Sequence, residues 1–424
     1  MIVSKTTAPF LALLLVSSAY AIENVKVTGE AKYWYQTTVK DTTSDKFFHQ
    51  NSSVGVAAAE LGVSADLLEG LKGKVSVMAL DSLGLEKSFV KDISTAGAGV
   101  EDNGYYRTQV WFTEANLDYK LGNTSAIVGR QALNTPLLFT ERWNASYNTF
   151  DAAVLMNSDI PYTTLVAAYV HQHNGGESSR DPLSTPVTFN NTRKNFPSTT
   201  MHNGSYYGFG STYNSVTNEV TDEKNRAYLF GAIIKPTKDL AMNLWYYDFN
   251  SMFNAYWIDA EYKISGMFFG IQNSGINADN SGVDNSMLTA AKVGYTLDKL
   301  TLDVAYSTTA TGNALTYSVV NAATGDKSKA YTQSVFQDGF VVGSLDTDVW
   351  RAGAAYQFDG FKISTSYQDV RQATKDGTEV DIIATAKVAQ YVNLTGMYIH
   401  QDVDEKTATD YKNDAFRLIA SVKF

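Results

Sequence analysis

The sequence has no cysteine and only 7 prolines among its 424 residues. The lack of cysteine excludes a secreted scaffold built on disulfides, so backbone pairing has to supply the rigidity. Beyond residue 21 no apolar run reaches the roughly 20 residues that a membrane-spanning helix needs, which excludes a helical membrane protein. No linker rich in proline, glycine or serine divides the chain. We therefore expect one domain over residues 22–424.

Positive charge is also scarce. Asp and Glu (44) outnumber Lys and Arg (34), for a formal net charge of −10, and loss of Lys5 with a leader peptide would make it −11. Such a chain repels phosphate backbones, so nucleic acid is not an expected partner. The motifs H-E-x-x-H and G-x-S-x-G and the P-loop are missing. Nothing in the sequence brings Ser, His and Asp together, so the protein is not expected to be an enzyme.

Three segments could in principle bind a metal. His171 and His173 are spaced to share one face of a strand, but no third ligand follows at a characteristic spacing. The Asp/Asn-rich segments 277–280 and 402–405 could hold Ca²⁺, although neither matches an EF-hand loop. Solvated loop edges explain all three more simply. We predict no cofactor, with loop-bound Ca²⁺ as the alternative.

Residues 1–21 have the pattern of a secretory signal peptide. Lys5 supplies the positive charge, residues 8–16 form a short apolar run, and Ala19-Tyr20-Ala21 is a cleavage site of the A-x-A kind. The run is too short to span a membrane. A buried N-terminal helix is the alternative. Cleavage after Ala21 would start the mature chain at Ile22.

The rest of the chain alternates apolar and polar residues with period two, as amphipathic β-strands do. In 378–388, for example, Val380, Ile382 and Ala384 oppose Asp381 and Thr385. The predicted strands are roughly 24–38, 53–67, 73–82, 106–120, 124–132, 150–159, 162–172, 226–235, 239–249, 253–263, 267–275, 286–297, 300–309, 346–357, 361–371, 378–388, 391–401 and 411–424.

The connections between these segments distinguish a membrane barrel from a soluble sandwich. With odd strands running upward, the connections at one end are all short, whereas at the other end most are long, as in 83–105, 173–225 and 310–345. Short periplasmic turns opposite long extracellular loops are typical of transmembrane barrels. In hydrocarbon a sheet has to close so that no edge stays unpaired. We predict an all-β fold, a closed antiparallel transmembrane β-barrel of about eighteen strands with a water-filled lumen.

The C-terminal segment strengthens this prediction. Phe416, Leu418, Ala420, Val422 and Phe424 fall on one face of the last predicted strand. An amphipathic final strand that ends on an aromatic residue resembles the assembly signal of bacterial outer-membrane barrels. Phe424 is therefore predicted to be read by the barrel assembly machinery. The 26 Tyr and 21 Phe could supply the aromatic girdles of such a barrel.

The connection after the fifth strand is unusually apolar and aromatic for a surface loop. It follows G-R-Q-A-L-N-T-P-L at 129–137, and Pro136 cannot donate to a strand ladder. Residues 133–149 are therefore predicted to fold against the inner wall and constrict the lumen. An ordinary external loop is the alternative. The predicted constriction residues are Arg130, Glu141, Arg142, Asp151 and Arg351.

This loop carries the most specific resemblance in the chain. G-R-Q-x-L-N-T-P-L with an aromatic and acidic close resembles the OprD-type outer-membrane porins, and in particular the major outer-membrane porins of epsilonproteobacteria. The resemblance implies an eighteen-stranded barrel, an inward-folded third loop, homotrimers and diffusion of small hydrophilic solutes. Some members carry a ladder of arginines for carboxylate solutes. This chain has only 9 Arg, which argues against such a ladder.

Two functions remain open at this stage. The first is a porin surrounded by outer-membrane lipid, through which ions and small hydrophilic solutes diffuse passively. The second is an outer-membrane barrel that acts as an adhesin or receptor through loops 173–225 and 310–345. For a porin, the negative net charge predicts a mild cation preference that shrinks as salt shortens the Debye length.

Overall fold

The computed structural model describes residues 22–44, 46–85, 88–90, 108–175, 206–209, 212–214, 219–221, 225–279, 282–312, 317–406 and 408–424. The predicted signal peptide and its cleavage site after Ala21 lie outside the described residues, so both stay predictions.

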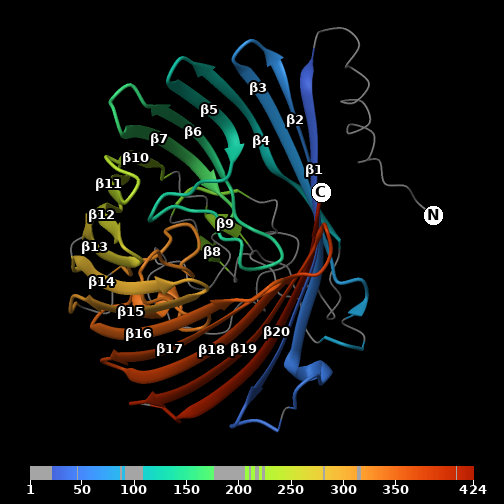
Figure 1. The fold of residues 1–424 in the computed structure, drawn as a ribbon, viewed down its shortest axis with the longest axis vertical. Coiled ribbons are helices and arrows are strands. Elements are labelled where there is room, and N and C mark those ends of the chain that lie inside the picture. The colour runs from blue at the N-terminus through green and yellow to red at the C-terminus, as the bar shows by residue number, and fades with distance from the viewer. Residues whose placement is uncertain are drawn as a thin grey trace.

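Eighteen strands form one sheet that closes on itself. The last strand, β20 (Tyr411–Lys423), pairs with the first, β1 (Glu23–Lys40), from Glu30 opposite Lys423 to Lys40 opposite Asn413. Figure 1 shows the C-terminus lying beside β1. Closure pairs the outer edges of the sheet with each other and leaves no free edge. The predicted fold class, a closed antiparallel β-barrel of about eighteen strands, is confirmed.

Every other strand pairs antiparallel with its barrel neighbours in chain order. These strands are β2 (Ser53–Leu68), β3 (Leu71–Asp81), β4 (Gln109–Leu121), β5 (Thr124–Gln131), β6 (Phe150–Asn157), β7 (Thr163–His173), β10 (Ala227–Ile234), β11 (Leu240–Phe249), β12 (Phe253–Ile264), β13 (Met267–Ala278), β14 (Ser286–Leu297), β15 (Leu300–Thr309), β16 (Thr347–Gln357), β17 (Phe361–Gln372), β18 (Lys375–Lys387) and β19 (Val392–Glu405).

Each predicted strand corresponds to one of these, with ends that differ by a few residues. The largest difference is in β19, which ends at Glu405 instead of residue 401 because its ladder with β18 continues to Lys375. The structure adds three short elements that alternation does not predict. They are the 3₁₀ turn η2 (Gln50–Ser52), the hairpin β8 (Thr212–Asn214) with β9 (Glu219–Thr221), and the helix α2 (Gly339–Val342).

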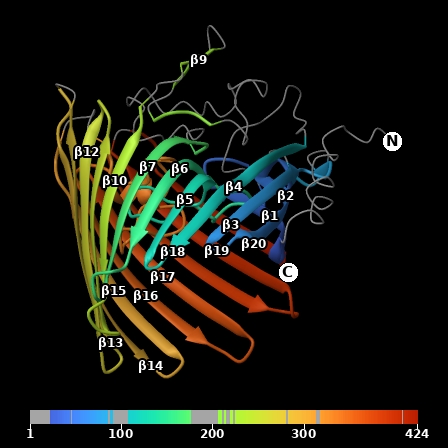
Figure 2. The same cartoon turned by 90° about the horizontal axis from the view of Figure 1, so that it is seen from above.

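The connections differ in length between the two ends of the barrel, as Figure 2 shows from the side. At one end, which we name the turn end, the connections are 69–70, 122–123, 158–162, 235–239, 265–266, 298–299, 358–360 and 388–391. At the other, the loop end, they include 41–52, 82–108, 132–149, 174–226 and 310–346. The turn at 265–266 shows the local chemistry, because Ser265 and Gly266 both have positive φ (50° and 84°). A two-residue hairpin turn of type I′ requires this at both positions.

Side chains alternate between an apolar outer face and the lumen. In β14, Met287 and Val293 are exposed on the outside, whereas Leu288 and Ala290 are buried on the inside. Large apolar side chains are exposed around the barrel at Phe230, Tyr246, Ile258, Ile271, Val293, Val304, Trp350, Tyr367 and Ile382. A soluble protein rarely exposes an apolar band of this extent, whereas lipid covers it. Among the described residues, no helix combines the length and the apolarity needed to cross a bilayer.

Candidate constriction site

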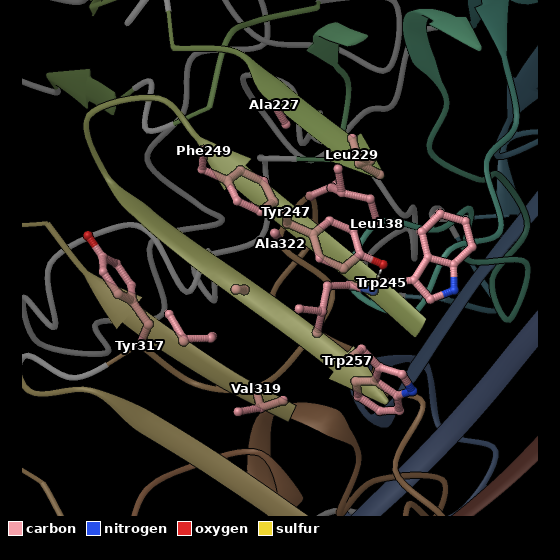
Figure 3. Close-up of a cluster of buried hydrophobic side chains, with 14 of the residues drawn as sticks. Leu138, Ala227, Leu229, Trp245, Tyr247, Phe249, Trp257, Tyr317, Val319 and Ala322 are labelled. Atoms are coloured by element: carbon pink, nitrogen blue, oxygen red, sulfur yellow. Dashed lines mark hydrogen bonds between the residues drawn. The ribbon is translucent and has the colours of Figure 1, made fainter. Parts of the chain in front are cut away.

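Residues 132–149 leave the end of β5 and pack inside the barrel. Leu137 and Leu138 are buried against the aromatic side chains of β11, and the backbone N–H of Leu137 donates to the Tyr247 hydroxyl at 3.2 Å. Figure 3 shows Leu138 among Trp245, Tyr247 and Leu229. Burial of these apolar side chains anchors the loop to the inner wall.

A second loop also lies inside the barrel. The backbone N–H of Ala322 donates to the Leu137 carbonyl at 2.8 Å, which joins the two loops. Gln272 on β13 donates to the Lys329 carbonyl at 2.9 Å, and Gln368 on β17 donates to the Thr332 carbonyl at 2.6 Å. Residues 317–346 therefore cross the lumen between distant strands. The sequence-based interpretation of 310–345 as an external loop is wrong for these residues. Alternation of apolar and polar residues predicts strands, and turn residues predict tight turns, but neither pattern indicates where a long polar loop packs.

Glu141 connects the two loops. Its side chain is 4% exposed. Its Oε1 accepts from Asn321 Nδ2 at 2.9 Å, from the Lys327 backbone N–H at 3.2 Å and from the Thr324 hydroxyl, and its Oε2 accepts from Trp143 Nε1 at 2.9 Å. A carboxylate with this many donors is held in one position. Glu141 therefore lies at the predicted constriction as a link between loops, and its oxygens are not free to meet a solute.

Arg142, the next residue, is exposed. Its guanidinium lies over the Tyr147 ring, 3.9 Å from the centroid. The Tyr147 hydroxyl donates to Glu60 on β2, and burial together with that carboxylate raises the pKa of Tyr147 above its usual value. The Arg142 guanidinium is thus held by a cation–π contact with a buried tyrosine beside the lumen wall, and its charge stays accessible to solvent.

Arg130 and Asp151 lie elsewhere. Arg130 pairs across the sheet with Ala115 on β4 and with Asp151 on β6. Two residues earlier on β5, Val128 pairs with Ala153 and is exposed on the outside of the barrel. Paired residues share a face, so both side chains are on the outer face at the loop end. Their ion pair is bidentate, with Nε–Oδ1 at 2.8 Å and Nη2–Oδ2 at 3.0 Å. The structure does not bring these two residues to the infolded loops. The sequence motif shows that Arg130 and Asp151 lie next to the loop, but it does not show on which face of their strands the side chains lie.

Arg351 on β16 faces the lumen. Its Nη1 lies 2.7 Å from Asp303 Oδ2 on β15, and both side chains are partly exposed. Of the predicted constriction residues, Glu141, Arg142 and Arg351 are therefore inside the barrel, in three different environments.

Sequence reasoning missed several residues that hold the loops. Glu379 on β18 accepts from the backbone N–H groups of Phe336 at 2.8 Å and Gln337 at 2.6 Å. Arg417 on β20 is buried, with its guanidinium 5.0 Å from the Trp34 ring and 5.8 Å from the Trp143 ring. In the sequence both appear as ordinary lumen-facing charges. The docked loops add to the partners on neighbouring strands, since Arg417 also donates to Gln36 on β1 and Glu379 also accepts from Gln401 on β19.

A further missed cation lies on the second loop. Lys329 is exposed, its Nζ is 2.8 Å from Asn134 Oδ1, and it lies over the Phe139 ring at 4.6 Å. Like Arg142, it presents its charge from an aromatic base. Arg142 and Lys329 thus present accessible positive charge from the two loops, whereas the carboxylate of Glu141 is enclosed.

The predicted histidine pair is split. His173 is buried and its ring lies 4.6 Å from Phe209, whereas His171 is exposed beside Tyr169. A bulge between β6 and β7 separates them, so they do not share a face. Among the described residues no group of three or more His, Cys, Asp or Glu is arranged to hold a metal. Of the segments proposed for Ca²⁺, residue 280 lies outside the described residues, and Asp402 is occupied by Lys412.

Comparison with solved structures identifies the fold. OccAB4 of Acinetobacter baumannii matches with a TM-score of 0.70 and 13% identity, over 95% of this chain and 99% of that chain. OccK8 (OprE) of Pseudomonas aeruginosa matches with a TM-score of 0.70 and 15% identity, over 96% and 99%. The chain has the fold of the OprD/Occ porins. P. aeruginosa OpdK, solved with vanillate, shows the Occ fold again at a TM-score of 0.68 and 11% identity, over 95% and 98%. No protein-family model and no curated protein matches the sequence.

Proposed function

We propose that this protein is an outer-membrane porin, through which ions and small hydrophilic solutes diffuse passively. The observation that carries the proposal is the combination of a closed barrel, an apolar outer face and two polar loops docked inside the lumen. Eighteen strands enclose more space than wall side chains alone fill. Loops anchored at Leu137, Glu141 and Lys329 narrow that space without needing to move for each solute.

Processing, assembly and oligomeric state are not determined by the fold, and we include them in the proposal. We infer that residues 1–21 are removed after Ala21, that Phe424 is read during barrel assembly, and that the mature protein forms homotrimers in outer-membrane lipid. We also infer that its nearest kin are the epsilonproteobacterial members of the OprD-type porins. The adhesin or receptor alternative loses one of its two loops as a free external segment, because residues 317–346 dock inside the barrel.

Planar-bilayer recording on purified protein tests the proposal directly. A porin should give stepwise, long-lived conductance increments in KCl, and boiled protein should give none. A correctly folded preparation that inserts without conductance would contradict the porin function and favour the adhesin or receptor role. Size-dependent swelling of liposomes in neutral sugars would provide an independent estimate of the passage.

A further inference from the structure

Lysines line the lumen close to the turn end of the barrel. On β12 the buried Trp257 faces the lumen, and Lys263 shares its parity. On β17, Lys362 shares the parity of the buried Gln368, and on β18, Lys387 shares the parity of the buried Asp381. Lysines in equivalent positions occur on both sides of the closure between β1 and β20. We name the set the lysine ring: Lys26, Lys72, Lys120, Lys263, Lys362, Lys387 and Lys423, all of them exposed.

Most of this positive charge is not neutralised by a direct contact. Lys72 lies 3.6 Å from Asp66, and Lys423 lies 3.6 Å from Glu30. The other ring lysines have no carboxylate at ion-pair distance within the described part of the chain. Exposed lysines without fixed partners keep their full charge and extend into the aqueous passage.

The lumen-facing carboxylates do not cancel the lysine ring. Of the carboxylates further along the strands, Glu114, Glu261 and Asp303 pair with Lys74, Lys292 and Arg351, and Glu379 and Asp381 are buried. Glu23, Glu30, Asp66 and Asp118 are lumen-facing carboxylates at the level of the ring. All four lie on β1, β2 and β4, whereas Lys263, Lys362 and Lys387 lie on β12, β17 and β18. The turns beneath it carry both signs, with Lys235, Lys238 and Lys299 among Glu69, Asp159, Asp239, Asp298 and Asp359.

The excess acidic charge of the chain lies in a different place. Strand register puts three aspartates on the outer face. Asp369 pairs with the outward Trp350, and Asp348 shares the parity of Trp350 on the same strand. Asp414 shares the parity of the exposed Leu418 on β20. The outer-face carboxylates at the loop end include Asp151, Asp248, Asp348, Asp369, Asp376, Asp402, Asp404 and Asp414. They are separated from the passage by the barrel wall, so the net charge of the chain is a poor guide to the field inside it.

We propose that the lysine ring is a selectivity element, which makes the passage prefer anions and conduct asymmetrically. The inference rests on the proposed porin function, which puts the turn end in the periplasm. Fixed positive charge at one mouth concentrates anions there. When the extracellular side is positive, chloride enters the passage at the ring and potassium enters at the other end. The ring repels potassium, so potassium accumulates inside the passage, and chloride accumulates with it to balance the charge. The current should therefore be larger at that polarity than at the opposite one.

The test is planar-bilayer recording in KCl, comparing the native protein with two matched triple variants. The ring variant is Lys263→Gln/Lys362→Gln/Lys387→Gln. The control variant, Lys46→Gln/Lys406→Gln/Lys412→Gln, removes the same charge from exposed positions at the loop end. Both substitute exposed side chains, so neither should disturb the barrel. Migration of unboiled samples on gels checks that all three proteins are folded. Because the chain has no cysteine, Ala408→Cys in the loop-end connection 406–410, coupled to biotin, allows streptavidin to report the orientation of each channel.

In a tenfold gradient around 0.1 M KCl, we expect native channels to pass chloride roughly twofold more readily than potassium. The ring variant should lose most of that preference and of the current asymmetry, whereas the control variant should keep both. At 1 M KCl, where the Debye length is only about 3 Å, all three should converge. Native cation preference, or equal shifts in both variants, would overturn the inference while leaving the porin function intact. Absence of conductance would instead contradict the porin function.

Discussion

Glu141 shows how one side chain can determine whether two loops act as a unit. Its oxygens accept from a side-chain amide, a backbone amide, a hydroxyl and an indole that come from both loops. Each hydrogen bond to an ionised acceptor contributes about 1.5–3 kcal/mol. Replacing the carboxylate by an amide keeps the shape but reverses part of the hydrogen-bonding pattern, because a buried NH₂ would face donors.

We therefore predict that Glu141→Gln loosens the junction of the loops by about 1–3 kcal/mol without unfolding the barrel. Single-channel recordings should show more current noise and more frequent closures than native channels. Glu69→Gln, in an exposed turn, is the matched control and should behave like the native protein. Quiet native-like recordings from Glu141→Gln would mean that the apolar anchors at Leu137 and Leu138 hold the loop unaided.

Arg142 and Lys329 differ from Glu141 because their charges are accessible. We predict that Arg142→Gln/Lys329→Gln moves the zero-current potential toward cation selectivity, since two positive charges leave the constriction. The paired substitution Arg130→Gln/Asp151→Asn, on the outer face, should leave the zero-current potential unchanged. A large shift from the outer-face pair would show that the passage lies on the other side of those strands.

At the level of the strand, the outer face should tolerate charge poorly. Ile271 lies in the middle of β13 and is 64% exposed on the outer face. We predict that Ile271→Arg destabilises the barrel by about 2–4 kcal/mol in lipid, because the guanidinium has to enter hydrocarbon. Asn243→Arg, which faces the lumen next to Asp259, should cost much less. Urea titration of protein refolded into liposomes measures both, and equal losses would contradict the assignment of the faces.

The last strand contributes a prediction about assembly. Phe424 is 63% exposed, and its backbone exchanges two hydrogen bonds with Gly29 on β1, at 2.9 and 3.1 Å. Deletion of Phe424 should reduce the amount of protein assembled in the outer membrane while export across the inner membrane continues. Fractionation with surface labelling measures both. Normal surface levels of the truncated protein would remove the argument that this residue is an assembly signal.

Strands could be predicted well because their signal is local. Alternation in segments such as 253–264 follows directly from one face in lipid and one in water, and tight turns such as 265–266 depend on two residues. The docking of residues 317–346 depends on contacts with β13, β17 and β18, far away in sequence. A bulge such as the one near His171 reverses the face of everything beyond it, and alternation alone does not reveal it.

For the whole molecule, the prediction concerns the architecture. Far-UV circular dichroism in detergent should be dominated by β-structure, and unboiled protein should migrate faster on gels than boiled protein, because a closed barrel resists unfolding by detergent. A helical spectrum would contradict the fold.

The pairing of β1 with β20 has a consequence for when this barrel can form. Glu30 meets Lys423, so the contact that completes the cylinder joins opposite ends of the polypeptide. Contacts at such separation are slow to form, since the intervening chain has to be organised first. Synthesis and translocation of the whole polypeptide therefore have to precede the pairing of β1 with β20. Until then both edge strands are open templates for pairing with other chains, and a holding chaperone would be needed to keep them apart.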